Sequence, residues 1–409
     1  MHMADALVSP AVAVTMYAAS AAAAGVSLVQ LHKEETAAPE LAKKKLPTMA
    51  VMSALVFAGQ MINYTIPGTG SSGHLCGGML LSAILGPWAG FLSMIVILAI
   101  QALFFADGGL LALGANVWNM AFYGCFVGYF LIYRPLMQGK LLSGKGRTKL
   151  VLASVLGCVV TLQLGALSVV VETSLSGITA LPFGAFAALM QPIHLAIGLV
   201  EGGITAAVLL FVYQTRPELL QCASASGAKN RCSRRAVLAI LTAAALVIGG
   251  GLSLLASSNP DGLEWSLFGN EEAGYSANMG LDEEAYGAES AAAEKAAAVQ
   301  EKTSLLPDYN FAGSDSAAGT SVSGLVGCAL VAALAACISL AGRTARKRSG
   351  KSRLQRGKIT RTQSKASPER GGGSAKPRRR GCSKFASTSQ SALRLPAPLS
   401  GEPWCLARR

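Results

Sequence analysis

The sequence is poor in charged and aromatic residues. Only 14% of its 409 residues are Asp, Glu, Lys or Arg, and only 6% are Phe, Trp or Tyr. A soluble domain of ordinary composition carries about 25% charged residues. Hydrophobic residues make up 52% of the chain and form long apolar runs, and a run of about 18 residues or more can cross a bilayer. This composition excludes a soluble globular protein and predicts a membrane protein.

Two sequence motifs that would indicate other chemistry are missing. The nine cysteines include no Cys-x-x-Cys pair, so neither a structural zinc site nor a dithiol redox centre is expected. Residues 139–146 approach the phosphate-loop pattern, but Gly146 stands where Ser or Thr would bind magnesium, and no strand precedes the segment. We therefore expect no ATPase activity in this chain. Cysteines within the apolar runs are expected to pack as small hydrophobic side chains.

The net charge of +13 is concentrated at one end of the chain. Residues 343–409 hold 19 Lys and Arg against 2 Asp and Glu, so the rest of the chain is net negative. This tail is of low complexity and has few aromatic residues for base stacking, so nucleic-acid binding is not expected. Attraction to anionic lipid, at about 1 kcal/mol per charge near the membrane, is the simplest role for it.

The apolar runs and the basic loops together predict a membrane topology. Nine candidate spans are residues 10–31, 47–64, 75–86, 88–105, 110–133, 149–172, 184–213, 236–256 and 322–341. Lys and Arg gather in loops 32–46, 134–149 and 214–235. The positive-inside rule places these loops in the cytoplasm. We therefore predict an all-α, polytopic bundle of about nine helices in the inner (plasma) membrane, with the N-terminus outside and the C-terminus cytoplasmic.

Two segments leave alternatives. Residues 75–105 form either one long helix or two passes broken at Gly86-Pro87, and only two passes keep the basic loop 134–149 inside, so we predict two, the first short and partly re-entrant. Residues 6–24 resemble a signal peptide, but no Lys or Arg precedes them and Asp5 does, so we expect an uncleaved span. Loop 257–321, with twelve acidic residues and two lysines, falls outside and is mostly disordered, with a polar helix near 288–302.

The first two residues, Met1 and His2, can chelate a metal ion. The terminal amine, the amide nitrogen of His2 and its imidazole close a five-membered and a six-membered ring. Such planar nitrogen donors suit Ni(II) or Cu(II) better than Zn(II), which prefers a tetrahedron. The bulky side chain of His2 is also expected to protect Met1 from aminopeptidase. The plain alternative is that a histidine stands at this position by chance.

The other histidines differ in setting. His74 follows the glycine-rich residues 67–73 on the outer side, where it is either a fourth nitrogen ligand or a loop and capping residue. His32 lies beside Lys33 and is expected to be a solvated interfacial group. His194 and Glu201 lie two helical turns apart on one face of a span, where ionisable groups are costly and usually functional. We favour a supporting role for this pair over a proton-linked one.

Several blocks of the sequence resemble a known family. They are the opening Met-His and residues 57–63, 73–78, 101–116 and 194–202. Together they are similar to the CbiM/NikM membrane component of energy-coupling-factor cobalt and nickel importers, over about residues 1–213. Residues 259–264, Asn-Pro-Asp-Gly-Leu-Glu, resemble the PDGLE-type (NikN-like) accessory subunit of the same importers. The presence of Met3 where the family would have an aliphatic residue is a departure, and the basic tail has no counterpart.

The resemblance implies a domain division and a function. Residues 1–215 would be the metal-capture membrane domain, 232–341 the accessory domain, and 342–409 a cytoplasmic tail. The metal ligands would be Met1, His2 and His74. The residues around them would be Asn63, Gln101, Asn116, His194 and Glu201. The cargo would be Ni(II) or Co(II), with no permanent cofactor, and the partners a transmembrane coupling subunit and cytoplasmic ATPase subunits on separate chains.

Two other classes of function are weighed against this one. An intramembrane metalloenzyme would need a general base, with Asp5 and Glu201 the candidates, and an open coordination position, which a planar four-nitrogen site lacks. An ATP-independent divalent metal permease would line a pore with acidic or carbonyl rings, and the spans hold few acids. We therefore expect a transport component and not an enzyme. The residues do not separate nickel from cobalt.

Overall fold

The computed structural model describes residues 1–139, 146–177, 181–222, 232–271, 273–274, 290–314 and 316–338, with the backbone alone for 41–44. All of these belong to one compact unit, Met1–Gly350. Residues 140–145, which make up most of the phosphate-loop-like segment, lie outside the described residues. The basic tail 342–409 lies outside them entirely.

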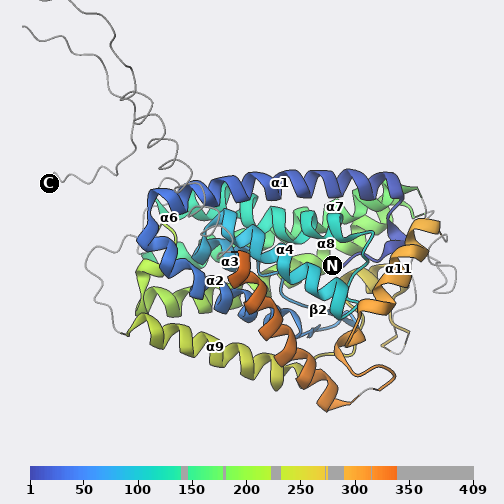
Figure 1. Ribbon diagram of the computed structural model, residues 1–409. Helices are drawn as coiled ribbons and strands as arrows, with labels where there is room; N and C mark the ends of the chain where they lie inside the picture. Colours follow the sequence, from blue (N-terminus) through green and yellow to red (C-terminus); the bar gives the residue numbers. More distant parts are fainter. Residues whose placement is uncertain are drawn as a thin grey trace, which may run out of the picture. The chain divides into compact units, whose positions relative to one another are not determined.

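The described chain is a bundle of helices with one short hairpin (Figure 1). The α-helices are α1 (Pro10–Ala37), α2 (Pro39–Gln60), α3 (Gly78–Leu85), α4 (Pro87–Phe104), α5 (Leu113–Asn116), α6 (Arg134–Met137), α7 (Gly146–Ser176), α8 (Phe183–Thr215), α9 (Arg234–Gly250), α10 (Gly262–Phe268), α11 (Ala291–Thr303) and the helix Ala317–Ile338. The wider helix η2 (Val117–Tyr133) joins α5 to α6, and single turns are η1 (Asp5–Leu7), η3 (Pro217–Leu219), η4 (Leu252–Leu255) and η6 (Pro307–Tyr309). The strands β1 (Tyr64–Ile66) and β2 (Ser71–Gly73) pair antiparallel.

The predicted bundle of membrane-spanning helices is confirmed, but the predicted number of nine spans is not. Among the described residues, six helices are long and apolar enough to cross a bilayer: Pro10–Ala37, Pro87–Phe104, Leu113–Met137, Gly146–Ser176, Phe183–Thr215 and Ala317–Ile338. Three of the nine predicted spans are absent from this set. Helix α2 begins with charged residues, α9 has 17 residues, and α3 has only 8, about 12 Å at the usual rise. The expectation of an all-α chain also missed the β1–β2 hairpin.

The break at Gly86-Pro87 occurs as the sequence suggests. Gly86 has φ of 86°, a conformation in which only glycine is unstrained, and it ends α3. Pro87 then opens α4, where a missing backbone N–H costs nothing. The chain therefore forms two separate helices at this point. The polar helix expected near 288–302 is also present, as α11.

Two glycines of α8 allow its backbone to pack closely on α7. A Cβ atom on Gly202 would lie 2.7 Å from Val155 Cα, and one on Gly198 would lie 2.9 Å from Val159 Cα. Gly198 and Gly202 are four residues apart on α8 and form a small-residue stripe, which lets membrane helices approach closely, and here it faces the backbone of Val155 and Val159 on α7. This stripe fixes α8, which carries His194 and Glu201, against α7.

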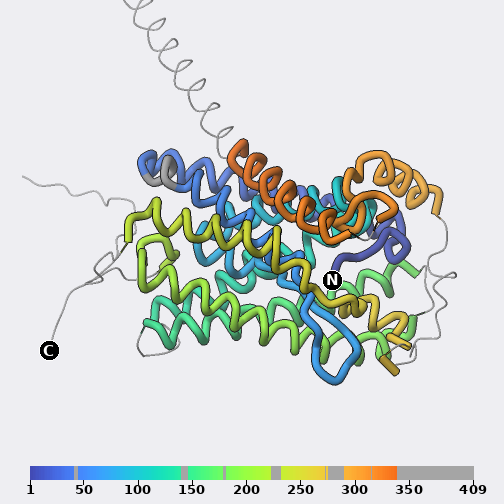
Figure 2. Tube along the Cα trace, turned by 90° about the horizontal axis from the view of Figure 1, so that it is seen from below, coloured from blue at the N-terminus to red at the C-terminus, as the bar shows by residue number. Residues whose placement is uncertain are grey.

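The C-terminal helices lie along the same bundle. In Figure 2 the helix Ala317–Ile338, drawn in orange and red, runs beside the rest of the bundle. It meets α9 where Gly249 and Gly324 face each other, and the Cys328 thiol lies 3.5 Å from the Ala54 carbonyl of α2. On α9, Arg234 donates a 2.6 Å hydrogen bond to Thr48 Oγ1. The two C-terminal helices are thus in close backbone contact with each other, and their side chains contact α2.

We predict that Gly202→Ala destabilises the bundle, because its Cβ atom would clash with the α7 backbone. The expected loss is about 1–3 kcal/mol, the usual cost of overpacking, measured as thermal unfolding of the purified chain in detergent. Gly203→Ala is the matched control, since a Cβ atom there meets nothing within 4 Å. Equal unfolding temperatures for the two variants would contradict the predicted role of the stripe.

Candidate metal-capture site

The N-terminus lies inside the bundle. Met1 is 4% exposed and Met3 is fully buried. Asn116 of α5 holds Met3 from both sides, because its Oδ1 accepts the Met3 N–H at 2.7 Å and its Nδ2 donates to the Met3 carbonyl at 3.1 Å. Gly109 N–H also donates to that carbonyl at 2.9 Å. The backbone of Met3 is therefore fixed by three hydrogen bonds, and the Met1 amine lies in the interior of the bundle.

The three predicted ligands come together. The Met1 amine lies 3.5 Å from His74 Nε2, although the two residues are 73 positions apart. The imidazoles of His2 and His74 stack with ring centroids 5.1 Å apart and an interplanar angle of 20°. The three residues predicted as ligands therefore lie in one neighbourhood, and whether they bind metal stays a prediction.

His74 is oriented as a ligand histidine would be. Its Nδ1 lies 3.1 Å from the Leu75 carbonyl, so Nδ1 carries the proton and Nε2 presents a lone pair toward the amine. Burial, together with the neighbouring Met1 amine and His2, lowers the pKa of His74 to about 3. The imidazole is therefore neutral at ordinary pH and able to donate to a metal.

The hairpin before His74 gives it this position. Strands β1 and β2 pair from Tyr64 opposite Gly73 to Ile66 opposite Ser71. The turn between them uses Gly68 and Gly70 at φ of 75° and 69°, which glycine adopts without strain. Glu201 of α8 fixes the chain on the other side of His74, accepting the N–H groups of Cys76 and Gly77 at 2.8 and 2.9 Å.

The remaining predicted residues lie around this centre in different ways. His194 lines a small cavity with Met1, His74 and Asp261, and its Nδ1 lies 2.8 Å from the Met190 carbonyl. Gln101 lies close enough to interact with the His2 ring and donates to Tyr309. Asn116 and Glu201 act on backbone, as described above. Asn63 has no described contact with the three predicted ligands: it lines a wide cavity next to them, and its carbonyl accepts the N–H of Ser257.

Two carboxylates that the sequence expectation did not single out contact the ligands. Asp261 Oδ2 lies 2.7 Å from the Met1 amine, and Asp107 Oδ1 lies 3.1 Å from His2 Nδ1. Asp107 in turn accepts a hydrogen bond from the Tyr309 hydroxyl. Asp107 and Asp261 lie within the blocks that suggested the family, whereas Tyr309 lies outside them. Their role was not visible because the contacts join segments far apart in sequence.

The charges at the amine offset each other. Burial opposes a charge on the Met1 amine, but the charge and hydrogen bond of Asp261 outweigh it and raise the pKa of the amine. Burial likewise opposes a charge on Asp261, but the amine and His74 hold the pKa of this carboxyl well below its usual range. The two groups therefore form an ion pair at neutral pH. Burial lowers the pKa of His2, partly offset by Asp107.

The site opens into an acidic vestibule of about 1800 Å³, open solvent included. Its lining holds five carboxylates, namely Asp5, Asp107, Asp261, Glu264 and Asp308, and among the described lining residues no Lys or Arg. Such a concentration of negative charge around a mouth raises the local concentration of cations. The approach to His2 and His74 is thus suited to a positively charged solute.

Comparisons with known proteins identify two matched regions. Residues 2–219 match a family model described as the cobalt uptake substrate-specific transmembrane region, and residues 235–344 match the PDGLE domain. The chain is 33% identical over 347 residues to a putative fused nickel transport protein NikMN of Archaeoglobus fulgidus, covering 84% of this chain and 100% of that protein. It is also similar to a probable fused nickel transport protein LarMN of Lactiplantibacillus plantarum (32% identity, 65% and 78% coverage).

Shorter matches cover the first region. A cobalt transport protein CbiM of Sorangium cellulosum is 36% identical over 174 residues, which is 42% of this chain and 76% of that protein. Among solved structures, a truncated transition metal transporter is 34% identical with a TM-score of 0.44, covering 52% of this chain and 99% of that one.

We predict that Asn116→Ala loosens the N-terminal segment, because it removes both side-chain hydrogen bonds to Met3 and leaves a buried N–H unpaired. The expected loss of stability is about 1–3 kcal/mol, with faster acylation of the Met1 amine, followed by mass spectrometry of the N-terminal peptide. Asn63→Ala, which removes an amide from the vestibule wall, serves as control. The interpretation is wrong if the amines of the two variants react at the same rate.

Proposed function

Because this chain belongs to the CbiM family of cobalt-uptake transmembrane regions and carries a PDGLE domain, we propose that it is the metal-capturing membrane component of an energy-coupling-factor importer for nickel or cobalt ions. The family resemblance drawn from the sequence is thereby confirmed. The relatives are named as transport proteins, which confirms the interpretation as a transport component and not an enzyme. The chain is a multi-pass membrane protein.

One observation supports the proposed site above all others: the buried amine of Met1 faces the unprotonated ring nitrogen of His74. Met1 N and His74 Nε2 are 3.5 Å apart, and the His2 ring stacks on His74. Amines are common at protein surfaces, but burying one among imidazoles is costly unless it is paired. With the amide nitrogen of His2 between them, these groups would supply four nitrogen donors. Such donors lean toward nickel, and the relatives are named for both metals.

Closing the chelate would require one rotation. In the structure His2 Nδ1 contacts Asp107 Oδ1 at 3.1 Å. The six-membered ring uses the same nitrogen, so we propose that the imidazole turns from Asp107 toward the amine when the ion arrives. Asp107 keeps its hydrogen bond from Tyr309 and so remains satisfied after the turn.

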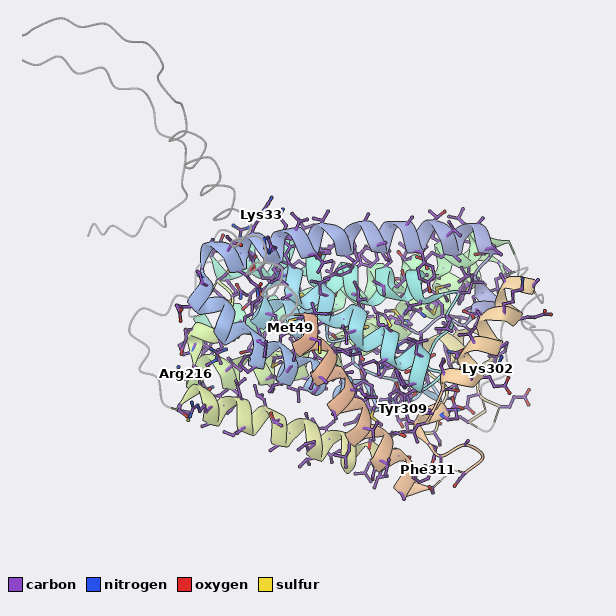
Figure 3. All side chains as sticks on the ribbon, in the orientation of Figure 1. Lys33, Met49, Arg216, Lys302, Tyr309 and Phe311 are labelled. Carbon is purple, nitrogen blue, oxygen red and sulfur yellow. The ribbon has the colours of Figure 1, made fainter. Side chains whose placement is uncertain are left out.

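We further propose the topology and division inferred from the sequence, with nine spans, the N-terminus outside and the C-terminus in the cytoplasm of the inner (plasma) membrane. Lys33 of α1 and Arg216, from two of the basic segments predicted to be cytoplasmic, lie at one end of the bundle, and Lys302 and Tyr309 lie at the other (Figure 3). This arrangement supports a cytoplasmic and an outer end. The proposed divisions are a capture domain at 1–215, an accessory domain at 232–341 and a basic tail at 342–409.

In the proposed mechanism the ion enters through the acidic vestibule and is caught at Met1, His2 and His74. ATP hydrolysis by partner subunits on separate chains, acting through a transmembrane coupling subunit, then reorients this component and releases the ion inward. An ATP-independent permease is the remaining rival. It requires no ATPase partner, so the partners distinguish the two.

We predict that one alanine placed before Met1 abolishes high-affinity nickel binding to the purified chain, because the amine would move away from His74 and the chelate rings could not close. Titration calorimetry in detergent measures the effect. His74→Ala should lose affinity similarly, whereas His32→Ala should bind as the unaltered chain, since His32 is exposed on α1. Unchanged binding by the extended chain would reject the chelate.

We predict that nickel or cobalt uptake into vesicles requires ATPase and coupling subunits supplied on other chains. Co-expression with the subunits encoded beside the gene, followed by affinity purification of this chain, should recover them in one complex. The complex reconstituted in vesicles should take up the ion only when ATP is present on the side of the membrane that corresponds to the cytoplasm. Uptake by this chain alone, at the same rate, would favour the permease.

A further inference from the structure

The carboxylate that pairs with the N-terminal amine comes from the PDGLE domain, not from the capture domain. Asp261 Oδ2 lies 2.7 Å from Met1 N, closer than His74 Nε2 at 3.5 Å. The Met1 side chain is 3% exposed and that of Asp261 21%. The contact therefore joins the first residue of the chain to a residue 260 positions later, at the wall of the vestibule.

Asp261 uses its two oxygens for different purposes. Oδ1 accepts the N–H groups of Leu263 and Glu264 at 2.7 and 2.9 Å, which caps the N-terminus of α10. Glu264 completes the capping box by reaching back to the Asp261 N–H. Because the cap fixes the direction of the carboxylate, Oδ2 is left at a defined place, and that place is beside the amine.

The segment that carries Asp261 is fixed to the strand that precedes His74. Ser72 N–H donates to the Pro260 carbonyl at 2.8 Å, and Ser72 Oγ donates to the Asn259 carbonyl at 2.8 Å. Ser72 and Asp261 form a parallel bridge. On its other side α10 packs on α8, where a Cβ atom on Gly262 would lie only 2.7 Å from Ile193. Asp261 and His74 are therefore held at a constant separation.

We propose that Asp261 is a positioning residue of the capture site: it holds the terminal amine beside His74, so the site is incomplete without the PDGLE domain. This inference rests on the proposed function, in which the amine and His74 are ligands. When a divalent ion bonds to the amine nitrogen, the ammonium proton leaves to solvent. Asp261 then faces the charge of the ion in place of that of the ammonium.

The test uses the full chain, purified in detergent and titrated with Ni(II). Asp261→Ser keeps an N-cap residue for α10, since serine caps as well as aspartate, but its side chain is too short to reach the amine. We expect nickel affinity to fall about tenfold or more, the size of effect that follows loss of a buried charged hydrogen bond. Asp261→Asn keeps both the cap and the shape of the side chain but loses the charge. We expect its nickel affinity to lie between that of Asp261→Ser and that of the unaltered chain.

Glu294→Gln is the matched control. It removes one negative charge from α11, where the Glu294 side chain is exposed and is not part of the vestibule lining. We expect its nickel affinity to stay within about twofold of that of the unaltered chain, a difference well under the tenfold step of 1.4 kcal/mol. An equal loss of affinity in Glu294→Gln and Asp261→Ser would overturn the proposal, because the effect would then be one of net charge alone.

A spectroscopic readout separates positioning from a merely structural role. At saturating nickel, the d–d absorption band of bound Ni(II) should shift in Asp261→Ser, because the amine is no longer held in place. An unchanged band would overturn the positioning role, whatever the affinity. If Asp261→Ser does not fold, Asp261→Asn decides by the same two measurements.

The same series separates this inference from the proposed function. If the unaltered chain does not bind nickel, or if His74→Ala binds as well as it does, the proposed capture site itself fails. If His74→Ala loses binding while Asp261→Ser retains both affinity and band position, the capture site stands and only the role of Asp261 is rejected.

Discussion

The structure depends on the pairing of one buried amine. A terminal ammonium group removed from water costs several kcal/mol unless an opposite charge compensates it, and here the amine of Met1 meets Asp261 at 2.7 Å. The arrangement of the residues around this pair follows from it. Asn116 must hold the backbone at Met3, the glycine-rich hairpin must bring His74 alongside, and the PDGLE segment must approach closely enough to deliver its carboxylate.

Closely packed elements support the residues around this pair. Glu201 of α8 binds the backbone just after His74, and the Gly198–Gly202 stripe seats α8 on α7. On the opposite side Gly108, at φ of 82°, passes so close to His2 and Asn116 that a Cβ atom would lie 2.9 Å from the Asn116 amide. A ligand set held on well-packed elements loses little freedom when an ion binds, which favours affinity. The supports therefore bear on binding as much as on folding.

Much of the fold could be predicted from sequence because apolar length and basic loops are local signals. The break at Gly86-Pro87 and the polar helix α11 are examples, each marked by its own residues. The number of membrane passes was harder, because α3 has 8 residues and α9 has 17, lengths that hydropathy alone does not classify. The β1–β2 hairpin was missed since glycine-rich loops give no alternating pattern.

The centre of the site was predictable for a different reason. Met1 and His2 are adjacent, and their chelating geometry follows from covalent structure alone, while His74 stood out as a histidine in a glycine-rich outer loop. Asp107, Asp261 and Tyr309 had no such local mark. Their contacts with the ligands arise only when the PDGLE segment packs against β2 and η6 packs beside α4. The sequence indicated the candidate donors, and packing places Asp107, Asp261 and Tyr309 around them.

The charge at the site also explains why a carboxylate can remain there with and without an ion. The ammonium of Met1 places one positive charge beside Asp261. With the proposed ligands, a divalent ion bound to a neutral amine, an ionised amide and two neutral imidazoles also carries a net charge of one. The exchange releases protons and leaves the charge facing Asp261 unchanged, so the counter-carboxylate need not move away. In the proposed mechanism the acidic vestibule acts on the approaching ion, whereas Asp261 holds the amine in place, so the two groups of carboxylates would act at successive points on the path of the ion.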